Sequence, residues 1–231
     1  MFPANIPLPH AALRTLAAVL CLAATLSVSA PTQAALVQTS FANGSLDMTL
    51  NRPGQSGQSV RVGGFTGVVN GSAFLSYCIE LAQSFSFGTS YKNYAVVPLA
   101  SAPNTSPMGA SKAMDLALLV GKNFADSFSS TVKTAAMQIA IWEIVHETAA
   151  TYSVTGGLFN VNAGNANVNA ARTLANTWLA ELPGLTATAP MVAFGSPTNQ
   201  DFITVVPVPP SVALFAGGLL FGIWSTRRRK A

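Results

Sequence analysis

Apolar and polar residues alternate near both ends of this chain, whereas the middle repeats its apolar residues at a helical period. Alternation with period two is typical of strands that have one face buried. Asn43-Gly44 and Asn70-Gly71 each separate two such segments, which predicts two hairpins. Strands are predicted over residues 36–41, 46–50, 59–69, 73–79, 91–99, 191–194 and 202–206.

Three helices are predicted between these groups of strands. The strongest covers residues 132–147, where Ala135, Ile139 and Trp142 follow the helical period. A second covers 114–120, with Gly121 as its stop, and a third covers 166–181 and ends at Pro183-Gly184. The stretches 101–107 and 156–167 are predicted loops. The predicted fold class is α+β, an antiparallel sheet or barrel with about three inserted helices, plus a C-terminal transmembrane sorting helix.

The first 34 residues are predicted to be a signal peptide. Arg14 precedes an apolar run over 16–28, and small residues follow near Ala34, so we expect a signal peptidase to cut after Ala34. A permanent membrane helix would need a longer apolar run. Cys21 leaves with this segment, so an exported domain over residues 35–206 keeps a single cysteine, Cys78.

The other end of the chain has three parts. A proline motif, with the sorting residues Pro207, Val208 and Pro209, leads into the uncharged stretch 211–226. A basic cluster predicted to stop transfer across the membrane follows: Arg227, Arg228, Arg229 and Lys230. An apolar stretch followed by basic residues predicts a helix anchored with its end in the cytoplasm. An ordinary tail anchor has the same physical pattern.

This layout over residues 207–231 resembles the PEP-CTERM sorting signals that exosortases handle in Gram-negative bacteria. Val208 stands where that family usually has glutamate, which is similar to the Val-Pro-Leu-Pro-Ala variant of the signal. The resemblance implies an exported protein that is anchored in the inner membrane at least transiently, then reaches the cell surface or extracellular matrix. Its implied partners are signal peptidase and an exosortase-type enzyme; whether the tail is cleaved stays open.

The net charge of the signal and the tail differs from that of the domain between them. The whole chain carries a formal charge of +4. The excess positive charge lies in the signal and the tail, because residues 35–206 hold about as many acidic as basic residues. A nucleic-acid partner therefore has no electrostatic support.

The candidate chemistry of the domain rests on Cys78 and Gln138. A leftover cysteine in an exported protein suggests a reactive thiol or an intermolecular bond. Gln138 shares a face of the predicted central helix with Ile141 and Trp142, so its amide needs partners. An inert buried thiol and an ordinary hydrogen-bonded glutamine are the default interpretations.

The sequence around both residues resembles the Cys–Gln thioester domains of Gram-positive surface adhesins. The two strings are Tyr77-Cys78-Ile79-Glu80 and Gln138-Ile139-Ala140-Ile141-Trp142. Met137 stands where those domains often have threonine. The resemblance implies that Cys78 sulfur is joined to the Gln138 side-chain carbon, that Tyr77, Ile141 and Trp142 shield the bond, and that it captures an amine or hydroxyl of a surface, polysaccharide or protein target.

Other function classes were weighed beside this one. Cys78 with His146 could imitate a cysteine-protease pair, but no family signature surrounds either residue, so no enzyme activity is expected. One cysteine and one histidine do not make a closed metal site, and no cofactor is expected. The main alternative is a non-reactive matrix or surface protein in which Cys78 is a buried core thiol.

Overall fold

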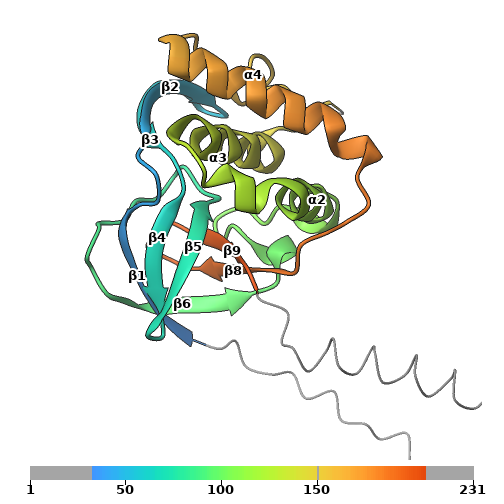
Figure 1. The fold of residues 1–231 in the computed structure, drawn as a ribbon. Helices are drawn as coiled ribbons and strands as arrows, with labels where there is room; N and C mark the ends of the chain where they lie inside the picture. Colours follow the sequence, from blue (N-terminus) through green and yellow to red (C-terminus); the bar gives the residue numbers. More distant parts are fainter. Residues whose placement is uncertain (1–32, 150, 207–231) are drawn as a thin grey trace, which may run out of the picture. The chain divides into compact units, whose positions relative to one another are not determined.

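Six antiparallel strands form a closed barrel in the computed structural model, which describes residues 33–149 and 151–206 (Figure 1). The strands follow one another around the barrel in the order β1-β4-β5-β9-β8-β6. Their bounds are β1 (Gln33–Phe41), β4 (Phe65–Val69), β5 (Ser72–Cys78), β6 (Tyr91–Val97), β8 (Met191–Gly195) and β9 (Phe202–Val205). The predicted combination of an antiparallel barrel with three helices is confirmed.

A second, three-stranded sheet lies outside the barrel. Its order is β3-β2-β7, with β2 (Leu46–Arg52), β3 (Gln55–Val62) and β7 (Asn160–Val161). The predicted hairpin between residues 36–41 and 46–50 is therefore wrong, since β1 and β2 belong to different sheets. The Asn43 amide donates to Phe128 O (3.0 Å), and Thr131 Oγ1 donates to Asn43 O (2.7 Å). These contacts fix the chain to the helices at the point where a hairpin turn was expected.

The other predicted hairpin, between β4 and β5, is confirmed. Asn70 and Gly71 both have positive φ, 48° and 85°, which is the backbone that a two-residue hairpin turn requires. The predicted strand 59–69 is divided, because β3 ends at Val62 and β4 begins at Phe65. A Cβ on Gly64 would lie 2.6 Å from a ring carbon of Phe128, so the chain passes the helices there only as glycine.

Three helices gather on one side of the barrel (Figure 1): α2 (Gly109–Ser127), α3 (Thr131–His146) and α4 (Ala166–Glu181). The predicted helices 132–147 and 166–181 are confirmed. The side chain of Ser130 caps α3 by accepting from Lys133 N (3.2 Å). α3 is buried without interruption from Thr134 to Val145. A helix that is buried all round must also bury its polar residues, which include Gln138.

The predicted end of the first helix at Gly121 is wrong. α2 continues for more than a turn beyond this residue, to Ser127. A Cβ at position 121 would lie 2.6 Å from Ala187 O and 2.9 Å from Ala189 N. Glycine is needed there for close packing against the chain that enters β8, and it does not end the helix.

The ends of the domain are held by short elements. α4 ends at Glu181, just before Pro183-Gly184, as the sequence predicted. The 3₁₀ helix η2 (Leu182–Gly184) follows it, and η1 (Leu99–Ser101) follows β6. β1 already begins at Gln33, and Ala34 is buried and pairs with Tyr94.

Within the part of the chain that the structure describes, no helix is long and apolar enough to cross a membrane. The predicted sorting helix and most of the predicted signal peptide lie outside the described residues.

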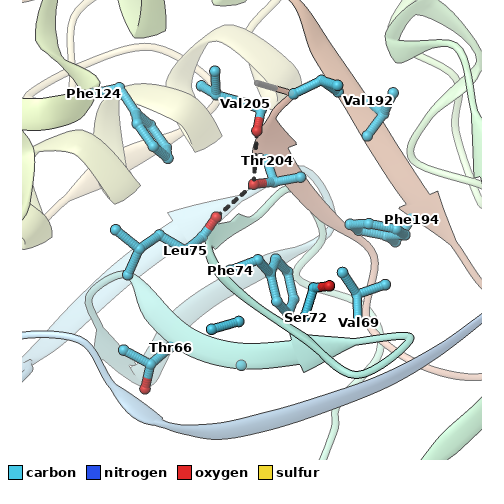
Figure 2. Close-up of a pocket in the computed structure, with 13 residues that line it drawn as sticks. Thr66, Val69, Ser72, Phe74, Leu75, Phe124, Val192, Phe194, Thr204 and Val205 are labelled. Carbon is cyan, nitrogen blue, oxygen red and sulfur yellow. Dashed lines mark hydrogen bonds between the residues drawn. The ribbon is translucent and has the colours of Figure 1, made fainter. Parts of the chain in front are cut away.

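β5 and β9 pair through Tyr77–Ile203 and Cys78–Phe202. Beyond these pairs, Thr204 Oγ1 donates to Leu75 O (2.7 Å), and an apolar pocket of about 620 Å³ lies around this contact (Figure 2). Phe74, Phe124 and Phe194 are among the residues that line it, but Cys78 and Gln138 are not. Cys78 therefore lies where β5 is paired with β9, away from this pocket.

Candidate functional site

Cys78 and Gln138 meet between the barrel and the central helix. Cys78 is the last residue of β5, as the sequence predicted, and Gln138 lies in the middle of α3. Each side chain is only 1% exposed. β5 contacts α3 directly, so the barrel strand that carries the sulfur faces the helix that carries the carboxamide.

Two hydrogen bonds join these residues in a closed pair. Cys78 N–H donates to Gln138 Oε1 (3.0 Å), and Gln138 Nε2 donates to Cys78 O (2.7 Å). The amide of Gln138 is thus held against the backbone of the residue that carries the thiol. Both bonds are buried, and they supply the partners that a glutamine inside an apolar helix requires.

The sulfur has partners of its own. Cys78 Sγ donates to Glu80 O (2.8 Å) and accepts from Gln200 Nε2, which also donates to Glu80 O (2.9 Å). Tyr94 OH donates to Gln200 O (2.7 Å) and so fixes the chain two residues before β9. Sequence reasoning missed Gln200, because a glutamine in a polar loop 122 positions away gives no local sign of a contact with the thiol.

Burial raises the pKa of the Cys78 thiol well above its usual value. The hydrogen bond from Gln200 opposes this effect, and the Glu80 carboxylate adds to it. The pKa of the Glu80 carboxyl is itself raised, mainly by burial. The thiol is therefore protonated at neutral pH, a form that is a poor nucleophile.

A cavity of about 290 Å³ reaches both residues of the pair. Its walls come from β1, β3, β4, the end of β5, the loop after β5, α3 and the loop before β9. Two of the residues that line it have buried polar atoms without a hydrogen-bond partner among the described residues: the Trp142 indole N–H and Gln83 Oε1. The residues that line it are Phe41, Gln58, Val60, Arg61, Gly63, Phe65, Cys78, Leu81, Gln83, Ser84, Phe85, Phe87, Gln138, Trp142 and Gln200.

Of the three predicted shielding residues, only Trp142 lines this cavity. The Tyr77 ring packs on Phe124 and Phe128, and its hydroxyl donates to Ser127 Oγ (2.8 Å). Ile141 is fully buried elsewhere in the core. Adjacent residues of a strand point to opposite faces, so Tyr77 and Cys78 cannot both face the cavity. The aromatic walls are instead Phe41, Phe65, Phe85 and Phe87, which the sequence analysis did not single out.

His146 and the Cys78 thiol contact different residues. Its ring stacks on Phe159 with 6.3 Å between centroids, and burial lowers its pKa to about 4. The hydrogen bonds of Cys78 go to Glu80 and Gln200. No group of three or more potential metal ligands occurs within residues 33–149 and 151–206.

The sorting residues Pro207, Val208 and Pro209 and the basic cluster 227–230 lie outside the described residues. No protein-family model matches this chain, and no curated protein or solved structure is similar enough to count as a match.

Proposed function

We propose that this chain is an exported surface or matrix protein that forms an internal Cys78–Gln138 thioester and uses it once for covalent attachment. In the forming step, Cys78 Sγ bonds to Gln138 Cδ and the bond from Cδ to Nε2 breaks. The thiol proton leaves with Nε2 as ammonia. A later nucleophile takes the acyl group, and Cys78 becomes a free thiol again.

The observation that carries this proposal is the pair of hydrogen bonds between Gln138 and Cys78. Negative charge builds on Oε1 when sulfur attacks Cδ, and the Cys78 N–H already donates to that atom at 3.0 Å. A fixed donor at a developing oxyanion lowers the barrier to acyl transfer. Because the amide is anchored to the attacking residue, the reaction also needs little further ordering.

Burial around the pair supports the same function. A thioester exposed to water hydrolyses, whereas Cys78 and Gln138 are both almost fully covered. The cavity beside them gives a nucleophile one route to the acyl carbon. The protein would then act by a single attachment and would not turn over as an enzyme.

A non-reactive core thiol is the competing function, and one observation favours it. The amide of Gln138 and the sulfur of Cys78 already have hydrogen-bond partners, and burial keeps the thiol protonated. In that case the pair would only stabilise the contact between β5 and α3. The reactive and the inert pair predict different masses for the same protein.

Intact mass of the exported protein, purified without reducing agents or amines, separates the two. A mass short by one ammonia relative to the Cys78→Ala and Gln138→Ala variants, each corrected for its substitution, is expected. Methylamine should then add to the wild type alone and release one thiol. A full mass, with one thiol that is alkylated after unfolding, would reject the thioester. The N-terminal sequence of the same sample tests cleavage after Ala34 and export.

A further inference from the structure

The cavity that reaches Cys78 and Gln138 has an unusual charge for an amine-capturing site. Among its described lining residues, Arg61 is the only charged one, and none is a carboxylate. The Arg61 guanidinium lies 5.0 Å from the centre of the Phe41 ring, and its Nη2 donates to Ser45 Oγ (3.3 Å). A cation held at the cavity repels an approaching ammonium group.

Aromatic rings form the apolar part of the same cavity. Phe87 is 41% exposed although it is a large apolar residue. Its ring packs on Phe41 (5.3 Å), Phe85 (5.1 Å) and Phe65 (6.0 Å), measured between centroids. An exposed aromatic ring on a supported cluster offers a flat apolar surface to a ligand. The C–H face of a sugar ring is such a ligand surface.

Two residues that line the cavity, Trp142 and Gln83, each have a buried polar atom without a partner among the described residues, one a donor and one an acceptor. Trp142 Nε1–H can donate, and Gln83 Oε1 can accept. The Gln83 amide nitrogen is held by Pro197 O (2.9 Å), which fixes the direction of the oxygen. A hydroxyl group is both donor and acceptor and can satisfy such a pair.

From these three features we infer that the nucleophile captured at this site is a hydroxyl group of a neutral carbohydrate. The inference rests on the proposed thioester. The hydroxyl oxygen bonds to Gln138 Cδ, the bond from Cδ to Cys78 Sγ breaks, and the hydroxyl proton goes to the sulfur. The products are an ester on Gln138 and a free Cys78 thiol.

An alkyl amine is disfavoured here for two reasons. Its usual pKa is about 10.4, so nearly all of it is protonated at neutral pH and must lose a proton before it attacks. The cavity offers Arg61 and no carboxylate to receive that cation. The volume of about 290 Å³ lies at the small end of ligand pockets, about 300 Å³, which suits one sugar ring at a time.

The test uses two oligosaccharides of the same backbone, incubated with the mature protein at neutral pH. One is a β-1,4-glucose oligomer, which has hydroxyl groups alone, and the other is the same oligomer with an added aminoethyl group, whose alkyl amine is protonated at neutral pH. Intact mass follows the adducts, and hydroxylamine distinguishes an ester, which it cleaves, from an amide. We expect the glucose oligomer to form an ester adduct, and the aminoethyl oligomer to form amide more slowly.

Two variants connect the preference to the cavity. Phe87→Ala should lower the rate of ester formation by about tenfold, because it removes the stacking surface. Arg61→Glu should raise the rate of amide formation relative to ester formation by about tenfold. Lys92→Glu makes the same charge change outside the cavity and should leave both rates within twofold.

The outcomes separate this inference from the thioester itself. A protein that reacts with methylamine but forms no ester with the glucose oligomer, or forms amide faster than ester, overturns the carbohydrate inference and leaves the thioester in place. A protein with no thioester overturns covalent capture. In that case, binding of the glucose oligomer to the Cys78→Ser variant, measured with and without Phe87→Ala, decides whether the cavity recognises sugar.

Discussion

Gln138 and Cys78, 60 residues apart in the chain, exchange two buried hydrogen bonds between one side-chain amide and one backbone unit. The two bonds resemble those between paired residues of neighbouring β-strands, because Cys78 contributes both its backbone N–H and its backbone carbonyl. It lies at the last residue of β5, where the strand meets α3. Loss of the amide therefore affects the fold as well as the proposed chemistry.

Gln138→Leu is expected to destabilise the domain by about 2–4 kcal/mol, because the Cys78 N–H and carbonyl lose buried partners. Urea unfolding measures this, in a Cys78→Ser background so that no thioester contributes. Gln83→Leu in the same background is the control, since the single bond of Gln83, to Pro197, is exposed. Equal unfolding midpoints for both variants would contradict the structural role of the Gln138 amide.

Gln200→Leu is expected to slow the reaction of the thioester with methylamine by about tenfold. Sulfur leaves carrying negative charge, and Gln200 Nε2 donates to it; a hydrogen bond to a charged group is worth about 1.5–3 kcal/mol. The rate is followed by intact mass. Gln83→Leu alters the same cavity without touching the sulfur and should react within twofold of the wild type. A Gln200→Leu protein that reacts as fast would remove this role.

Glu143→Gln is expected to stabilise the domain above pH 7 by about 1–3 kcal/mol. Burial, with a smaller contribution from the Glu147 carboxylate, raises the Glu143 pKa to about 7, although the hydrogen bond from Ser153 N and the charge of Lys112 lower it. Because the Glu143 pKa is higher in the folded protein than in the unfolded chain, the contribution of Glu143 to the free energy of unfolding is greatest below pH 4.5. This contribution is lost as the pH rises through about 7. The advantage of glutamine, which can still accept from Ser153 N, should vanish below pH 4.5. Urea unfolding at pH 4 and pH 8 checks this, and a gain equal at both pH values would refute it.

Gly121→Ala is expected to lower the melting temperature, although alanine normally stabilises a helix interior by about 1 kcal/mol. The added Cβ would lie 2.6 Å from Ala187 O, a backbone atom that cannot swing aside. Gly184→Ala is the matched control, because no atom lies within 4 Å of its Cβ position. Calorimetry of both variants should show a lower melting temperature for Gly121→Ala alone. A higher melting temperature for both variants would mean that Gly121 makes no close contact that alanine disturbs.

Local sequence patterns predicted the elements that depend on near neighbours. The helix 132–147 has a cap at Ser130 and a clear apolar period, and the β4–β5 hairpin has Asn70-Gly71 at its turn. The errors at Asn43 and Gly121 have a common cause. Each residue follows a local rule for turns or helix ends, and each is instead used for a distant contact, with Phe128 and with Ala187.

The candidate site was predictable only in part, because some of its residues come from loops that are far from Cys78 and Gln138 in the sequence. Cys78 and Gln138 were found through the two strings around them, and the structure brings them together. Gln200 and Phe87 lie in polar loops without a period, and no spacing connects them to the thiol. Tyr77 was expected beside the sulfur, but the alternation of a strand turns it toward α2 instead.

The pairing of β5 with β9 sets the order in which the site can be completed. Cys78 pairs with Phe202 and contacts Gln200, which lie near the end of the described chain. The ribosome makes Cys78 and Gln138 well before Phe202 and Gln200, but a domain folds as a unit. The Cys78 sulfur can therefore receive the hydrogen bond from Gln200 only after β9 has joined the barrel. The surroundings of Cys78 are complete only when the barrel is closed.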